Sequence, residues 1–183
     1  MLYFKYIFNP MGCKFHPEVN IKKGGFIMFR EMRRDNKAIT HEAAIELLHK
    51  CEYGTLSTIG SDGYPYGVPL NYACKDDALY FHCATEGHKL DNIEKNSKVS
   101  FCVVGDAKVI PEKFSTKYES VIVFGRANIV TDDNEKKAAL FALIEKYAPD
   151  YTESGKKYIS NDFNKTKVVR IDIEHITGKK AKE

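Results

Sequence analysis

Gly87, His88 and Lys89 are the residues best suited to bind a phosphate, because they lie where a strand gives way to a helix. The first amides of a helix have no partner within the helix, and the positive end of its dipole attracts anions. A lysine is unfavourable at that end unless an anion is bound. Free amides and a cation at a helix start make a natural seat for a phosphate, but taken alone Lys89 is better explained as a solvated surface residue.

His82 and Cys83 precede this seat at the end of an apolar strand, LYFHCA. Alternation along the strand directs His82 away from the side taken by Phe81 and Cys83. An imidazole that faces a cleft can donate a hydrogen bond or a proton. A lone strand histidine is nevertheless more often a core residue whose hydrogen bonds are satisfied. Cys83 has no second cysteine nearby to act as a redox partner.

Several other classes of function lack their motifs in this sequence. There is no G-x-S-x-G, no P-loop and no G-x-G-x-x-G after a strand, and the histidine and cysteine spacing predicts no metal site. A net charge of +3 is too small to indicate a nucleic-acid surface. No apolar run approaches the ~20 residues that cross a bilayer, so we expect no membrane partner. Five cysteines without a C-x-x-C pair, and no signal-peptide pattern, favour a reduced, cytoplasmic protein.

The elements that must position these residues are mostly strands. Turn residues 60–63 separate the first two strands, and Pro65 and Pro69 require the second strand to be an edge or to be interrupted. Helices are predicted after the cap Thr40 and after the cap Asp132. Residues 106–117 read as a loop. The predicted strands are residues 53–59, 67–74, 78–84, 99–104, 120–130 and 167–173. Six strands with few crossover helices favour a mainly β, antiparallel barrel with flanking helices.

Several segments, in this order, resemble the FMN-binding split barrels of the pyridoxamine 5'-phosphate oxidase-like superfamily, and most closely the nitroimidazole reductase (nitroimidazole resistance) branch. The resemblance implies a six-stranded antiparallel split β-barrel over residues 33–183, with residues 1–32 as an N-terminal arm outside the pattern. It also implies a homodimer with flavin near the subunit interface. The segments are YGTLST (53–58), DGYPYGVPLNY (62–72), LYFHCATEGHKLDNI (79–93), VSFCVVG (99–105), YESVIVFGRA (118–127) and IDIEHITGKK (171–180).

The same resemblance assigns FMN contacts residue by residue. His88 and Lys89 fall on the phosphate-binding basic pair, which is often Arg-Lys, so His88 is a weaker and pH-sensitive donor. In the oxidases the flavin strand begins with arginine and ends with lysine, where this chain has Tyr66 and Asn71. His82 matches a histidine implicated in the reaction of the nitroimidazole branch. The implied cofactor contacts are Tyr66, Gly67, Val68, Pro69, Leu70, Asn71, His82, Cys83, His88, Lys89 and Ser120.

The resemblance implies an FMN-dependent oxidoreductase that reduces nitroimidazole-type or related small aromatic compounds with electrons from an external donor. Two alternatives remain open. One is a vitamer oxidase like pyridoxamine 5'-phosphate oxidase, whose substrate-phosphate arginines are not evident in this sequence. The other is a protein that binds flavin or haem without turnover, because related split barrels serve several functions.

Overall fold

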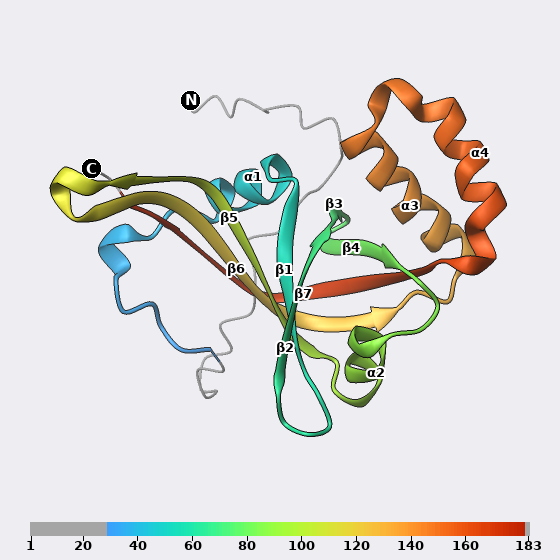
Figure 1. Ribbon diagram of the computed structural model, residues 1–183, viewed down its shortest axis with the longest axis horizontal. Helices are drawn as coiled ribbons and strands as arrows, with labels where there is room; N and C mark the ends of the chain where they lie inside the picture. The colour runs from blue at the N-terminus through green and yellow to red at the C-terminus, as the bar shows by residue number, and fades with distance from the viewer. Residues whose placement is uncertain (1–28, 182–183) are drawn as a thin grey trace, which may run out of the picture.

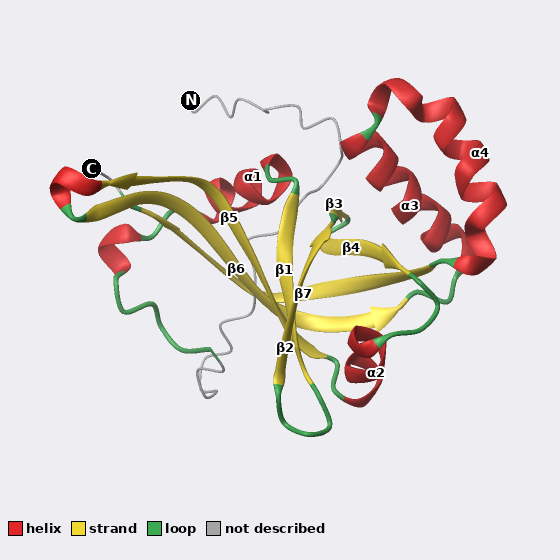
Figure 2. Cartoon of the chain, viewed as in Figure 1, coloured by secondary structure: helices red, strands yellow, loops and turns green. Residues whose placement is uncertain are grey.

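The computed structural model describes residues 29–181, so residues 1–28 of the expected N-terminal arm lie outside the described part of the chain. Within it, seven strands form one antiparallel sheet in the order β2-β1-β5-β6-β7-β4-β3 (Figures 1 and 2). The strands are β1 (Tyr53–Ile59), β2 (Pro65–Asn71), β3 (Ala73–Lys75), β4 (Ala78–Cys83), β5 (Lys98–Ile110), β6 (Ser115–Ile129) and β7 (Lys167–Lys180).

The sheet curls into a barrel that is closed at only one point. β2 and β3 lie at opposite ends of the sheet order, yet they follow one another in the chain and are separated only by Tyr72. The two edges of the sheet therefore meet at Tyr72 and diverge beyond it. This arrangement confirms the predicted split β-barrel. It has seven strands rather than six, because the predicted strand 67–74 is divided at Tyr72 into a part paired with β1 and a part paired with β4.

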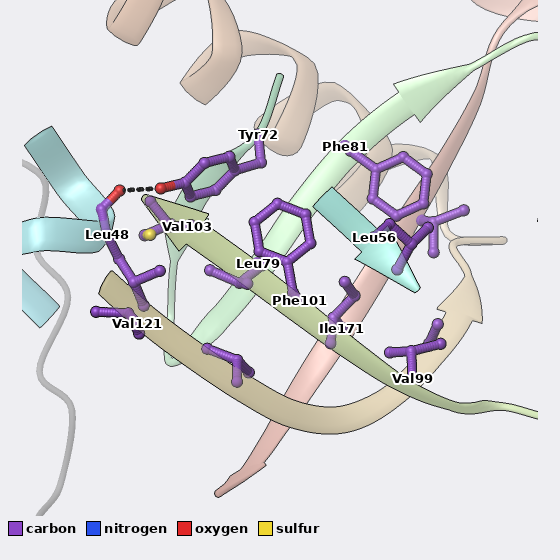
Figure 3. Close-up of a cluster of buried hydrophobic side chains, with 14 of the residues drawn as sticks. Leu48, Leu56, Tyr72, Leu79, Phe81, Val99, Phe101, Val103, Val121 and Ile171 are labelled. Atoms are coloured by element: carbon purple, nitrogen blue, oxygen red, sulfur yellow. Dashed lines mark hydrogen bonds between the residues drawn. The ribbon is translucent and has the colours of Figure 1, made fainter. Parts of the chain in front are cut away.

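The barrel core is apolar and includes one anchored tyrosine. Tyr72 is fully buried, its ring meets Phe101 edge to face at 4.8 Å, and its hydroxyl donates to the carbonyl of Leu48 at 2.6 Å (Figure 3). Phe81 and Ile171 from the other side of the barrel are also fully buried in this cluster. The point at which the two edges join is therefore fixed by packing and by a buried hydrogen bond.

In the described part of the chain four α-helices flank the barrel: α1 (His41–Lys50), α2 (His88–Lys95), α3 (Asp133–Tyr147) and α4 (Thr152–Asp162). Both predicted caps are confirmed, since Thr40 Oγ1 accepts from the Ala43 amide and Asp132 Oδ1 from the Glu135 amide. Figure 1 shows α3 and α4 together at one end of the molecule, beside β4 and β7, while the β5–β6 hairpin reaches the opposite end. None of the described helices is long and apolar enough to cross a membrane.

One local prediction differs from the structure. Residues 106–117 were predicted as a loop, but most of them continue β5 and β6 into a long hairpin. The register between β6 and β7 shifts at Gly125, where a Cβ would collide with the Asp172 carbonyl oxygen.

Candidate functional site

The candidate site lies where the two edges of the barrel separate. β3 and β4 pair with Ala73 opposite Tyr80, and continuing that register would place Asn71 opposite His82 and Tyr66 opposite Gly87. The ladder stops before those pairs form, so β2 and residues 82–89 face each other without pairing. This opening is named the split. Two segments of the predicted site, residues 66–71 and 82–89, therefore lie on opposite sides of this opening.

The outer edge of β2 offers backbone groups to the split. The Gly60 amide donates to the Tyr64 carbonyl at 3.0 Å. Antiparallel alternation then directs the backbone groups of residues 66, 68 and 70 to β1, and those of residues 65, 67, 69 and 71 away from it. Pro65 and Pro69 therefore stand where no amide is needed for pairing with β1, as the edge-strand prediction required. Gly67 and Asn71 keep amides that point toward the split.

At one end of the split the start of α2 meets β2. The rings of Tyr66 and His88 lie 4.2 Å apart, centroid to centroid. The helix is held against β1 by a buried hydrogen bond from Asn92 Nδ2 to Thr58 Oγ1 at 2.9 Å. Gly87 has a φ of 139°, which a residue with a side chain rarely adopts, and it leads directly into the helix. His88 and Lys89 are thereby brought to the first turn, beside Tyr66.

At the other end of the split lies a cavity of about 330 Å³ between β4, α3 and α4. Asn71 and His82 both line it, which confirms that the two sides of the split approach each other here. Its walls are largely apolar: Leu140, Leu143, Ile144, Ile159 and Phe163. A larger hollow of about 650 Å³ between α3 and α4 includes none of the predicted site residues.

His82 points away from the barrel core, as alternation predicted. Phe81 is fully buried in the core, whereas His82 is partly exposed at the lining of the cavity. The surrounding protein lowers the pKa of His82 below its ordinary value by desolvating the imidazolium. The imidazole is therefore neutral at neutral pH and protonates only in more acidic solution. A neutral imidazole can both donate and accept a hydrogen bond within the cavity.

Tyr147 fixes α3 at the junction between the cavity and the barrel. Its hydroxyl accepts from the Tyr72 amide at 3.0 Å and lies 2.5 Å from the carbonyl oxygen of Glu52 and 2.7 Å from that of Tyr72. A second link comes from Glu135, whose carboxylate accepts from the Tyr80 hydroxyl and pairs with Arg170. The wall of the cavity is therefore attached to the junction of the two edges at Tyr72, and to β4 and β7. The sequence did not point to Tyr147.

Cys83 points toward the barrel side of the split, opposite to His82. Burial raises the pKa of its thiol, while the positive charges of Lys89 and Lys167 lower it, so the group is a neutral thiol at pH 7. Lys167 was not among the residues predicted from the sequence. It is the first residue of β7 and the cross-strand partner of Cys83. Only the pairing of β4 with β7 brings the two residues together.

Ser120 is the one predicted cofactor contact that the structure places away from the split. It lies on β6, paired with Val104 on one side and Lys179 on the other. It does not line the cavity beside His82. The flavin contact of Ser120 therefore stays a prediction. In the described part of the chain no group of three or more His, Cys, Asp or Glu residues could hold a metal ion.

Comparison with known families and curated proteins gives one match. A family model described as pyridoxamine 5'-phosphate oxidase matches residues 40–180. That range includes both sides of the split, the cavity and all four α-helices. A search of curated proteins finds no match to the chain.

Several solved structures share this fold, and their descriptions name different ligands or roles. A candidate 5-nitroimidazole antibiotic resistance protein from Bacteroides thetaiotaomicron is 23% identical, with a TM-score of 0.64 over 78% of this chain and 85% of that one. An FAD-binding protein from Mesorhizobium loti is 25% identical, with a TM-score of 0.57 over 80% and 97% of the two chains. An FAD- and haem-binding protein from Mycobacterium smegmatis is 20% identical, with a TM-score of 0.71 over 80% and 74%.

Proposed function

The chain belongs to the pyridoxamine 5'-phosphate oxidase family, and from this premise we propose that it is an FMN-dependent reductase of small nitro-aromatic compounds in the cytoplasm. The observation that carries the proposal is that the two ends of the split differ in chemistry, one being basic and the other apolar. One end presents His88 and Lys89 at a helix start, and the other opens into an apolar cavity at His82. FMN has the same polarity, with a phosphate at one end and a planar ring at the other.

The residues present fit this cofactor along its length. His88 and Lys89 would hold the phosphate, and Tyr66 would cover it from β2. Val68 and Leu70 face inward from the same strand and offer apolar contact. The backbone of residues 67, 69 and 71 points into the split and can pair with the polar edge of the ring. Bound FMN supplies the electron transfer, while the protein binds and orients it.

The cavity is the proposed substrate site, and His82 is its proposed catalytic residue. Apolar walls from α3 and α4 exclude water and suit an uncharged aromatic compound. His82 stands where the cavity meets the split and can hydrogen-bond to a nitro oxygen or deliver a proton to the substrate. The description of the Bacteroides protein motivates the choice of this substrate class, although its likeness shows the fold alone. An external donor is required to supply the electrons.

We further propose that the active form is a homodimer in which β6 of one protomer approaches the flavin of the other. Ser120 is too far along the sheet to serve its own split, so its predicted flavin contact requires this arrangement.

Two competing functions are kept as alternatives. A vitamer oxidase is disfavoured because Tyr66 and Asn71 stand where the oxidases carry cations. A binder without turnover is suggested by the descriptions of the FAD-binding and the FAD- and haem-binding neighbours.

The test is the rate at which a nitroimidazole reoxidises the reduced flavin of the holo-protein. The wild type should reoxidise faster than free reduced FMN, and the His82→Ala variant should retain FMN but lose about 10²-fold in rate. Because burial lowers the pKa of His82 below its ordinary value, the imidazolium forms only in acidic solution. If His82 donates a proton, the wild-type rate should rise through that acidic range, and the rate of His82→Gln should not.

Three outcomes distinguish the possibilities. An unchanged rate in His82→Ala would show that His82 is only part of the cavity wall. Loss of FMN from that variant would assign His82 to cofactor binding instead of catalysis. A wild-type holo-protein that reduces no nitro compound with any donor would favour a binding protein and refute the reductase.

A further inference from the structure

The hollow between α3 and α4, named here the α3–α4 groove, is not used by the proposed flavin site. Its volume of about 650 Å³ is within the range of about 300–1,000 Å³ that is usual for small-molecule sites. Ile159 and Phe163 line both this groove and the cavity at His82, so they form the wall between the two. The groove is therefore a separate hollow that borders the proposed substrate site.

The groove is lined by two positive charges and by no carboxylate. Lys137 comes from α3 and Lys156 from α4, and the other lining side chains are uncharged. Within residues 29–181, Lys137 forms no ion pair. Lys156 pairs with Glu153 at 2.6 Å, but both side chains are more than half exposed, and such a pair contributes little. The charge of the groove therefore suits an anion.

Aromatic rings lie beside the same two charges. Lys137 Nζ is 5.5 Å from the centroid of the Phe163 ring, and Lys156 Nζ is 5.8 Å from that of the Phe141 ring. Phe163 is held to α3 by Lys136, whose Nζ donates to the Phe163 carbonyl at 2.7 Å. Both rings are only partly buried. Each cation of the groove is therefore within 6 Å of an aromatic surface that a ligand can cover.

We propose that the α3–α4 groove binds a small aromatic carboxylate. Lys137 and Lys156 hold the carboxylate, and the rings of Phe141 and Phe163 contact its aromatic part. In such a compound the negative charge is attached to a ring, as the cations of the groove lie beside its phenyl groups. Lysine attracts the carboxylate by charge-assisted hydrogen bonds, and burial of the ring adds the hydrophobic effect.

This site goes beyond the proposed function, because it lies outside the split and requires no flavin. Its occupant would nevertheless contact Ile159 and Phe163, which also line the cavity at His82. The groove is thereby placed to bind a compound beside the proposed substrate site without entering it.

The test compares three ligands of similar shape and different charge: 1-naphthoate, 1-naphthylmethanol and 1-naphthylmethylamine. Each is titrated by calorimetry at neutral pH into the protein with and without saturating FMN. The anion should bind about tenfold more tightly than the neutral alcohol, and the cation should bind most weakly. FMN should not change the affinity for 1-naphthoate, because the flavin is proposed to occupy the split.

Two variants remove the charges of the groove one at a time. Lys137→Gln and Lys156→Gln should each weaken 1-naphthoate binding about tenfold and leave binding of the alcohol unchanged. Lys157→Gln is the matched control, because Lys157 is the next residue of α4, is exposed and does not line the groove. That control should bind all three ligands like the wild type.

Three results would overturn the site. Equal affinities for 1-naphthoate and the alcohol would show that the groove does not select an anion. An affinity for 1-naphthoate that neither lysine variant changes would place the ligand elsewhere, and no binding to the wild type at millimolar concentration would refute the site outright. Each result can be obtained on protein without FMN, so a failure of the proposed flavin function is distinguished from a failure of this site.

Discussion

At the scale of single residues, Lys89 is the group on which phosphate binding depends most. It is in the first turn of α2, and that helix is held to β1 by the buried pair of Asn92 and Thr58. Lys89→Ala should fold normally and bind FMN about tenfold to a hundredfold more weakly. Lys95→Ala, at the opposite end of the same helix, is the control and should not change the affinity. Equal affinities for the wild type and Lys89→Ala would place the phosphate elsewhere.

The sequence predicted the side of the strand from which His82 projects. It could not predict that Lys167 lies beside Cys83. Alternation within one strand is a local property, and it correctly separated His82 from Phe81 and Cys83. The approach of Lys167 to Cys83 depends on the register between β4 and β7, which are far apart in the chain. Register follows from packing of the whole barrel, so a single sequence carries no signal for it.

At the scale of elements, Tyr147 joins α3 to Tyr72, where the two edges of the barrel meet, and to Glu52 before β1. Tyr147→Phe removes the hydroxyl and leaves the partly buried Tyr72 amide without its partner. We expect it to lower the free energy of unfolding by about 1–3 kcal/mol, as measured by urea denaturation. Tyr151→Phe is the control, because that side chain is 69% exposed. Equal stabilities of the two variants would show that the hydroxyl does not fix the helix.

Elements with strong local signals were predicted well, and those without them were not. The caps Thr40 and Asp132 use side chains three residues from their partners, so the sequence reveals them. The hairpin of β5 and β6 beyond residue 104 is exposed on both faces, so its residues show little of the alternation that identifies a strand. Its residues were therefore interpreted as a loop.

At the scale of the whole molecule, the outer face of β5 and β6 is apolar and, within residues 29–181, partly exposed, with Phe29 packed beside Phe124. Val104, Ile122 and Phe124 are 58%, 40% and 37% exposed, and they alternate with fully buried valines. A second copy packed on this face would cover them, so the holo-protein should sediment as a dimer at micromolar concentration. Ile122→Lys should shift it toward monomer, and Tyr151→Lys, on the connection between α3 and α4, should not. A monomeric wild-type holo-protein would contradict the dimer.

The measurement that tests the account most directly is the identity of the ligand held in the split. Protein purified without added cofactor is denatured, the released ligand is identified by its mass and spectrum, and the refolded apo-protein is titrated with FMN, FAD and haem. We expect FMN, one per protomer, to be released from the native protein or taken up by the apo-protein in preference to the others. Release of haem or FAD, or failure of the apo-protein to bind FMN, would contradict it.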